Sequence, residues 1–313
     1  MPSEPIFRCG TAAILGRPNV GKSTLLNALV GERVSIVTPR PHTTRHRILG
    51  VVTRPEGQIL YLDTPGMHAQ AKRAMNRSLN RAVQTAVAEA DVAVQVIEAG
   101  RWNDEDEAVH AAIATAPIPR LLALNKLDRV RDKAALLPFV EQLCSRHAFD
   151  DVFWLSAQRG EGVAELERGI LGLLPQRQPV FDPDTFTDRS ERFLCAELIR
   201  EQLMRQLGEE LPYATTVEIE SFKDRSQHHP PPNLPLEGGG AGLAEISAVV
   251  WVEREGQKKI VIGAGGERLK MIGSAARRGI EALLGRRAFL RLWVKVREGW
   301  SDDEAALKRF GYE

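Results

Sequence analysis

Short apolar runs alternate with longer amphipathic segments throughout the first half of the chain. Each run is bounded by turn residues or charges, which is typical of strands buried on both faces of a sheet. The runs are TAAIL (11–15), QILYL (58–62), VAVQVI (92–97), RLLALN (120–125) and DVFWLS (151–156). The segments between them have helical periodicity, in residues 22–31, 77–90, 104–116 and 135–147. Strand alternating with helix predicts an α/β domain with a mostly parallel sheet over residues 1–174.

This alternation stops near Leu174. Residues 175–190 carry three prolines and several aspartates, which is the composition of a linker. An amphipathic helix is predicted next, over residues 191–210, because its apolar residues fall near one face. These apolar residues are Phe193, Leu194, Ile199, Leu203 and Leu207. We therefore expect a second domain over residues 191–313.

The rest of the second domain mixes strands and helices. Residues 215–222 and 245–255 alternate apolar and polar side chains, as half-buried strands do. Between them, residues 224–243 contain three consecutive prolines and three consecutive glycines, which predicts a flexible and poorly ordered surface loop. The remaining patterns predict a strand over 257–263, a helix over 266–285 and a final strand over 287–296.

Composition narrows the class of protein. The 313 residues are 43% hydrophobic and 27% charged, which is ordinary for a globular protein, and the net charge of +1 means that any nucleic-acid site must be a local patch. The three cysteines, Cys9, Cys144 and Cys195, have no paired spacing, which fits a reducing cytosol and argues against disulfide or zinc frameworks. The N-terminus shows no signal-peptide pattern, and no apolar run approaches the roughly 20 residues that span a bilayer. We expect a soluble, cytoplasmic protein.

The stretch GRPNVGKST links the first predicted strand to the first predicted helix. It fits GxxxxGK[ST], in which glycines let successive backbone N–H groups turn towards phosphate oxygens. The following helix directs the positive end of its dipole at the same anion. Lys22 is expected to reach the β- and γ-phosphates and Ser23 to ligate Mg²⁺. The predicted nucleotide-binding residues here are Gly16, Arg17, Pro18, Asn19, Val20, Gly21, Lys22, Ser23 and Thr24.

Three more stretches lie at the ends of predicted strands, where open parallel sheets bind ligands. DTPG can hold Mg²⁺ through its aspartate and sense the γ-phosphate through its glycine N–H, although alone it is only a good β-turn. NKLD offers a carboxylate to the N1–H and exocyclic amine of guanine, although alone it could be a helix cap. The backbone of SAQ can close over guanine O6. The residues concerned are Asp63, Thr64, Pro65, Gly66, Asn125, Lys126, Asp128, Ser156 and Ala157. Together, in this order, the four stretches predict a GTP-binding domain.

These motifs, with PHTTRHRILGV (41–51), resemble the Era family of bacterial GTPases. Three segments of the second half resemble it too, ELPYATTVEIE, VEREGQKKIVIG and LWVKVREGWSDDEAALKRFGY, so the resemblance covers nearly the whole chain. It implies a P-loop GTPase domain followed by an α+β type II KH domain that binds the 3′ end region of 16S ribosomal RNA and assists assembly of the 30S subunit. It also implies GTP, GDP and Mg²⁺ as ligands, a monomer, and peripheral association with the inner face of the cell membrane.

The catalytic group for hydrolysis is not obvious. Signalling GTPases place a water-orienting Gln just after the DxxG motif, where this chain has Met67. The group must then come from elsewhere in the chain, from a bound cation or from a partner. By resemblance to related GTPases, Asn19 is a candidate for holding a K⁺ ion that acts as an arginine finger. The resemblance also makes residues 43–45 the mobile switch segment, with Thr44 contacting Mg²⁺. The candidate catalytic residues are Asn19, Lys22 and Thr44.

The stretch IGAGG (262–266) resembles the KH signature IGxxG, here expected between a strand and a helix. Such loops clamp about four nucleotides of single-stranded backbone. Residues 254–297 hold twelve Lys/Arg and three acids, a net charge of +9 that suits a polyanion, although without the loop a solvated basic helix face would be preferred. The family usually has a basic residue at the middle of the loop, where this chain has Ala264 and Gly265. The expected RNA-binding residues are Gly263, Ala264, Gly265, Gly266, Arg268 and Lys270.

Two other functions stay open. A GTP-gated RNA-binding adaptor with negligible hydrolysis is compatible with Met67 in place of Gln. A GTPase serving RNA modification would need an additional catalytic domain, for which no residues remain. Trp300 and the predicted helix over residues 301–310 look like a docking or RNA-flanking element.

Overall fold

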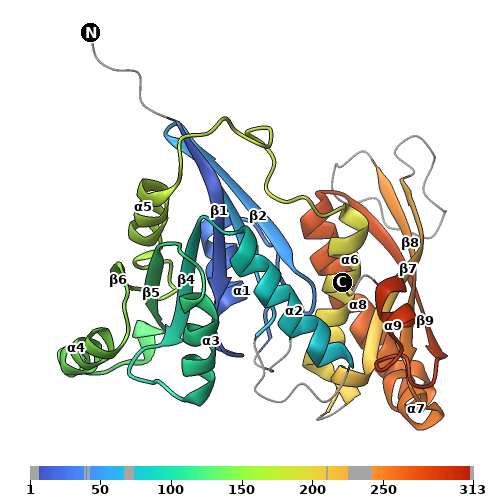
Figure 1. Ribbon diagram of the computed structural model, residues 1–313. Helices are drawn as coiled ribbons and strands as arrows, with labels where there is room; N and C mark the ends of the chain where they lie inside the picture. The colour runs from blue at the N-terminus through green and yellow to red at the C-terminus, as the bar shows by residue number, and fades with distance from the viewer. Residues whose placement is uncertain are drawn as a thin grey trace. The chain divides into compact units, whose positions relative to one another are not determined.

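The computed structural model describes residues 7–38, 40, 43–66, 74–208, 211–224 and 242–310. The described residues divide into two compact units, one ending at Asp188 and the other beginning at Arg189 (Figure 1). The segment read as a linker is attached to the first unit by hydrogen bonds. Its Pro175 carbonyl accepts from Cys9 N at 3.0 Å, and Gln58 Oε1 accepts from Val180 N at 2.8 Å. The division between the units lies between residues 188 and 189, inside the segment 175–190 that the sequence predicts as a linker.

The first unit is built on a six-stranded sheet with the order β2-β3-β1-β4-β5-β6. All neighbours are parallel except β2, which pairs antiparallel with β3. The five runs read as strands are β1, β3, β4, β5 and β6, and β2 is a sixth that the apolar pattern did not single out. The strands are β1 (Arg8–Leu15), β2 (Ile48–Arg54), β3 (Gly57–Asp63), β4 (Val92–Glu98), β5 (Arg120–Asn125) and β6 (Asp151–Trp154).

Five helices flank this sheet (within the described residues) on its two faces. Helices α2 and α3 cover one face, because Val83, Ala86, Val109 and Ile113 pack against Ala13 and neighbouring strand residues. Helices α1 and α5 contact each other on the other face (Figure 1). The bounds are α1 (Lys22–Val30), α2 (Ala74–Glu89), α3 (Asp104–Ala114), α4 (Leu136–Arg146) and α5 (Val163–Leu173), with a 3₁₀ turn at Leu127–Arg129. The loops at the carboxyl ends of β1, β3, β5 and β6 carry the four predicted motifs.

The second unit packs helices on one three-stranded sheet, in the order β7-β8-β9. β7 and β8 are antiparallel, whereas β8 and β9 are parallel. Helices α6 and α8 bury Leu198, Ile199, Ile272, Ala276 and Ile280 against the sheet. The bounds are α6 (Glu191–Gln206), β7 (Thr215–Asp224), β8 (Leu243–Val252), α7 (Glu255–Ile262), α8 (Glu267–Leu284), β9 (Arg287–Val296) and α9 (Glu304–Arg309), with 3₁₀ turns at Leu211–Ala214 and Ala264–Gly266.

The predicted strand over residues 257–263 is wrong, because these residues form most of helix α7. The β-branched residues Ile260, Val261 and Ile262 favour a strand by local preference. However, β8 and β9 run parallel, and parallel neighbours need a crossover, which α7 and α8 supply. Burial along the segment has helical spacing, because Val261 is fully buried, Gln257 and Lys258 one turn earlier are half-buried, and the two residues between are exposed. The glycine loop therefore joins two helices, not a strand and a helix.

Two further expectations concern the second unit. Trp300 is fully buried, its Nε1 donates to Ala214 O at 3.3 Å, and its ring meets Phe310 edge-on. It therefore packs the C-terminal segment onto the unit and has no exposed surface for RNA. Most of the loop expected to be poorly ordered, residues 225–241, lies outside the described residues. None of the described helices is long and apolar enough to cross a membrane.

Candidate functional site

The phosphate loop joins β1 to α1 in a space that admits only glycine at two positions. A Cβ at Gly16 would lie 2.4 Å from Val96 O, and one at Gly21 would lie 2.3 Å from Asn125 Nδ2. Gly21 also has φ +102°, which side chains rarely adopt. Helix α1 begins after Gly21. Among the described residues, no side chain caps its N-terminus, and its first turn contains no acidic residue. Its first N–H groups are therefore available to an anion.

Lys22 is folded back onto the loop that precedes it. Its Nζ donates to Gly16 O at 2.8 Å and to Arg17 O at 2.9 Å. Burial lowers the pKa of Lys22 to about 8, and the opposite charge of Asp63 limits the drop. The ammonium is thus held by carbonyl groups at the position where phosphate oxygens of a nucleotide would compete for it.

Three oxygen-bearing side chains meet beside Lys22. Ser23 Oγ lies 2.7 Å from Thr44 Oγ1 and donates to Asp63 Oδ2 at 2.9 Å, and Thr44 Oγ1 lies 3.4 Å from the same carboxylate oxygen. Asp63 is fully buried and its Oδ1 has no partner among the described residues. Burial raises the pKa of Asp63, whereas Lys22 and the hydroxyl groups counteract this rise. Hard oxygen donors around an unpaired carboxylate oxygen fit Mg²⁺.

Ser35 is a member of this cluster that the motifs did not reveal. It is 1% exposed, and its Oγ donates to Asp63 Oδ2 at 3.0 Å. Asn27 of α1 fixes it by accepting from Ser35 N at 2.9 Å and donating to Ser35 O at 2.7 Å. No sequence signal distinguishes Ser35 from other loop serines, because its role depends on a contact with a strand 28 residues away.

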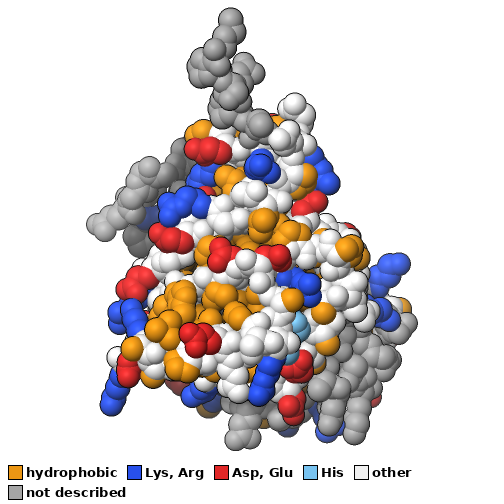
Figure 2. Space-filling model, turned by 60° about the vertical axis from the view of Figure 1, so that its left-hand side comes forward, with side chains coloured by type: hydrophobic (Ala, Val, Ile, Leu, Met, Phe, Trp, Pro, Cys, Tyr) orange, Lys and Arg blue, Asp and Glu red, His pale blue; other side chains and the backbone are white. Residues whose placement is uncertain are grey.

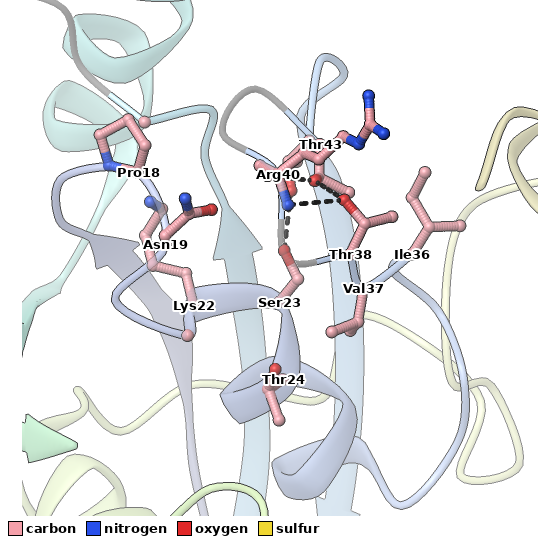
Figure 3. A pocket seen from close by; sticks show the side chains of 13 residues that line it. Pro18, Asn19, Lys22, Ser23, Thr24, Ile36, Val37, Thr38, Arg40 and Thr43 are labelled. Atoms are coloured by element: carbon pink, nitrogen blue, oxygen red, sulfur yellow. Dashed lines mark hydrogen bonds between the residues drawn. The ribbon is translucent and has the colours of Figure 1, made fainter. Parts of the chain in front are cut away.

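A pocket opens over these groups. It is lined by the phosphate loop on one side and by residues 36–38, 40, 43 and 44 on the other (Figure 3). Pro18 and Asn19 stand opposite Thr38, Arg40 and Thr43, and Thr38 Oγ1 lies 2.6 Å from Thr43 Oγ1. The exposed Asn19 has φ +64° at the rim. The structure therefore brings the loop and the predicted switch segment to one pocket.

The guanine motif is connected directly to the phosphate loop. Asn125 Nδ2 donates to Val20 O at 2.8 Å, and Asn125 Oδ1 accepts from Ala157 N at 3.0 Å. Ser156 Oγ donates to Asp128 Oδ1 at 2.6 Å, and this bond is the main reason why the pKa of Asp128 is lowered. Asp128 is thus an ionised acceptor, as recognition of the guanine N1–H and amine requires.

The DTPG stretch lies against the phosphate loop. Thr64 Oγ1 donates to Ile14 O at 3.0 Å, and a Cβ on Gly66 would approach Pro18 within 2.8 Å. Pro65 connects Thr64 to Gly66 in the chain, and Thr24 lines the pocket over the phosphate loop. Met67, which stands where other GTPases have Gln, lies outside the described residues.

The KH-like loop projects between α7 and α8. Gly263 has φ +75° and ψ 175°, and a Cβ on it would meet Arg268 at 2.7 Å. Gly265 and Gly266 also have positive φ, but nothing lies within 4 Å of their missing side chains. Arg268 NH1 donates to Ile260 O at 2.9 Å, so this arginine connects the first turn of α8 to α7.

A hollow begins at the glycine loop and extends between α8 and the edge strand β9. Its lining is Gly266, Leu269, Lys270, Gly273, Ser274, Arg277, Leu290 and Leu292. A glycine at position 273 keeps the hollow open, because a Cβ there would lie 3.3 Å from Leu292. The apolar floor offers a surface for bases, and Lys270 and Arg277 offer charge for the backbone.

Comparisons with known proteins agree over the whole length. The family model described as a 50S ribosome-binding GTPase matches residues 11–126, and that of the KH domain matches residues 234–301. The GTPase Era of Stenotrophomonas maltophilia is 54% identical over 313 residues, which is 100% of both chains. The GTPase Era of Xanthomonas oryzae is 55% identical over 98% of this chain and 97% of the relative.

The chain belongs to the Era family of GTPases.

Solved structures of Era agree with this assignment. Aquifex aeolicus Era, in a variant bound to GDP and aluminium fluoride, is 36% identical with a TM-score of 0.89, covering 97% of this chain and 99% of that one. Era in complex with MgGDPNP and nucleotides 1506–1542 of 16S ribosomal RNA is 36% identical with a TM-score of 0.90, covering 98% and 99%. The chain is thus a GTP hydrolase, which removes the non-hydrolysing adaptor from consideration.

The positive charge of residues 254–297, +9 by sequence, is partly neutralised by carboxylates in the folded KH unit. At least six of the twelve basic residues form ion pairs, and five of their partner carboxylates lie outside residues 254–297: Glu191, Glu220, Asp224, Glu245 and Asp303. Lys259, Lys270 and Arg278 form no ion pair with any residue that the structure describes. Figure 2 looks onto the left-hand side of Figure 1, over elements of the first unit, where acidic and basic side chains are interspersed.

Proposed function

We propose that this Era-family GTPase binds the 3′ end region of 16S ribosomal RNA through its KH unit and assists assembly of the 30S subunit, with GTP and GDP setting its state. The hollow between α8 and β9 carries this proposal. It combines a glycine loop open to phosphate with an apolar floor for bases and Lys270 at its margin. The solved Era complex with nucleotides 1506–1542 of that RNA, at a TM-score of 0.90, supports the same partner.

The nucleotide site supports GTP with Mg²⁺. Ser23, Thr44 and Asp63 are the residues that would hold the metal, which neutralises charge on the β- and γ-phosphates when bound. Lys22 would bind the phosphates, and Asp128 would select guanine over adenine by accepting two hydrogen bonds. Binding of γ-phosphate engages Thr44 and Gly66, which gives the two nucleotides different effects on the switch segment.

Three finer points stay predictions. Potassium held near Asn19 is our expectation for the missing charge stabilisation, and faster hydrolysis in potassium than in sodium salts would support it. A monomer and peripheral association with the inner membrane face are expected as well. Analytical ultracentrifugation and flotation with anionic lipid vesicles test these two points.

RNA binding by the full-length chain tests the central proposal. The probe is a single-stranded oligonucleotide with the 3′ end sequence of 16S RNA, compared with the same sequence in a duplex. Ala264→Asp with Gly265→Asp should abolish binding of the single strand, since carboxylates would meet its phosphates. The matched control adds two carboxylates at exposed positions outside the hollow, Gly256→Asp with Ala282→Asp. Equal binding by both double variants would contradict the proposal.

A further inference from the structure

Two carboxylates outside every GTP motif lie between the phosphate loop and the guanine motif. Glu98 is the last residue of β4, and Asp106 lies in the first turn of α3. Both face Arg17, the second residue of the phosphate loop, at 3.8 Å and 3.1 Å respectively. Neither belongs to a motif recognised in the sequence, and each contacts a residue of a GTP motif.

Asp106 holds Arg17 from a rigid position. It is fully buried, and its Oδ2 accepts from Arg17 Nε at 3.1 Å and from Asn103 N at 3.2 Å. Asn103 Oδ1 accepts in return from Asp106 N at 3.1 Å, which completes a capping box, and the Asp106 carbonyl accepts from Gln95 Nε2 at 2.8 Å. Besides the bond to Arg17, three bonds thus hold Asp106, one at its carboxylate and two at its backbone, so that it determines where Arg17 lies.

The position of Arg17 matters for phosphate because its own carbonyl holds Lys22. Lys22 Nζ donates to Arg17 O at 2.9 Å. A lysine in this place reaches the β- and γ-phosphates. A chain of direct contacts therefore runs from Asp106 through Arg17 to the ammonium that binds the two outer phosphates.

Glu98 has a different second contact. Its Oε2 accepts from Lys126 Nζ at 2.9 Å, in the NKLD motif. Lys126 is one of the non-glycine residues with positive φ, at +66°, a conformation that costs about 1 kcal/mol and needs support from its surroundings. Asn125 Oδ1 holds its N–H at 2.8 Å, and Glu98 holds its side chain. Glu98 thus acts on the base side of the site.

We propose that Asp106 and Glu98 are positioning residues for GTP, in which Asp106 sets the phosphate loop through Arg17 and Glu98 sets the guanine motif through Lys126. This inference concerns nucleotide binding alone and does not depend on the RNA partner. The two carboxylates should differ in how their loss depends on the number of phosphates in the nucleotide. Loss of Asp106 should matter more for nucleotides with more phosphates, whereas loss of Glu98 should matter equally for all guanine nucleotides.

Dissociation constants of GTP, GDP and GMP for the full-length chain provide the test. Asp106→Asn should weaken GTP binding about tenfold, GDP binding less and GMP binding least, because Lys22 meets the β- and γ-phosphates, of which GDP has one and GMP has none. Glu98→Gln should weaken all three by the same factor of about five, because the base is common to them. The control is Glu107→Gln, the next residue of α3 after Asp106. Its carboxylate contacts Trp102 and His147 and should leave all three constants unchanged.

Asp106 also caps α3, so its replacement could act by loosening that helix. Arg17→Gln keeps the cap intact and should reproduce the dependence on phosphate number. The double variant Arg17→Gln with Asp106→Asn should lose no more GTP affinity than the single variant that loses most, because the two residues form one contact. Additive losses in the double variant, or an equal loss of GMP and GTP in Asp106→Asn, would overturn the assignment of Asp106. A loss in Glu98→Gln that grows with phosphate number would overturn that of Glu98.

Discussion

The nucleotide site and the glycine loop of the KH unit are both suited to phosphate, but they are built in different ways. In the first, Ser23, Thr44 and Asp63 are bonded to one another and Lys22 is buried against carbonyl groups. In the second, Gly265 and Gly266 have open space around them, and Ala264 is exposed. One site is held together by contacts among its side chains, whereas the other presents bare backbone.

The difference follows from the ligands. A nucleotide concentrates several negative charges in a small volume, so the charges and dipoles facing it must be fixed in advance, and burial makes each of them stronger. A single-stranded RNA spreads one charge over each nucleotide, and the loop only has to let the backbone approach. Disturbing single side chains should therefore affect the first site strongly, and adding side chains should affect the second.

The largest effect is expected from Lys22. Lys22→Ala removes the cation that faces the outer phosphates, and we expect GTP binding to weaken at least about a hundredfold. The nucleotide-free protein should melt at no lower a temperature, because burying this ammonium disfavours the charged form. Calorimetric titration and thermal unfolding measure the two quantities. A large fall in the melting temperature of the nucleotide-free protein would show that Lys22 serves the fold.

Stability of the nucleotide-free protein should depend on pH through the same residue. Burial lowers the pKa of Lys22 to about 8 from its usual 10.5, so between these values the unfolded chain binds more protons than the folded one. The free energy of unfolding should then rise with pH across this window, by up to about 3 kcal/mol from Lys22. Lys22→Met removes the contribution, and the difference between the two proteins in urea unfolding from pH 7 to 10.5 measures it. Parallel curves would contradict the prediction.

The glycine loop can be tested with two alanine substitutions of unequal cost. Gly263 has backbone angles that essentially only glycine adopts, and its Cβ would strike Arg268, so Gly263→Ala should lower stability by about 2–3 kcal/mol. Gly265 has φ +58° and free space, so Gly265→Ala should cost only about 1 kcal/mol while still weakening RNA binding. Urea unfolding and RNA titration of both variants separate the roles. Equal stability losses would mean that the space around Gly263 can adjust.

The smallest effect is expected from Ser35. Ser35→Ala removes one hydrogen bond to Asp63 and leaves those of Ser23 and Thr44, so the Mg²⁺ concentration needed for half-maximal GTP binding should rise about threefold. Ser145→Ala is the control, since this exposed hydroxyl group donates only to Gln142 O on α4. A melting temperature that falls without any change in the Mg²⁺ requirement would assign Ser35 to the fold alone.

Much of the nucleotide site was predictable because its chemistry is local. Gly16, Gly21, Lys22 and Ser23 lie in one short loop, and the order of the other motifs follows from the alternation of strands and helices. The residues that were missed act across the sheet. Ser35, Glu98 and Asp106 have no neighbours in sequence that mark them, and each acquires its role from a partner 28 to 89 residues away.

In the second half, local preference and tertiary structure disagreed at α7. The IVI run favours a strand by side-chain shape, and the segment is helical because the parallel pair β8 and β9 needs a crossover. The net charge of residues 254–297 was misleading for a similar reason, because carboxylates from α6, β7, β8 and the segment before α9 neutralise several of its arginines and lysines.

The sequence by itself determined the two-domain order, the GTP motifs and the glycine loop, because these depend on residues that are close together in the chain and on backbone conformations that few residues allow. Only the tertiary structure decided which carboxylates face Arg17 and Lys126, which hydroxyl groups meet at Asp63, and which basic side chains stay unpaired along α8. Those outcomes depend on how strands and helices from distant parts of the chain pack together, and charge–charge and hydrogen-bond energies depend on distances that no local pattern contains.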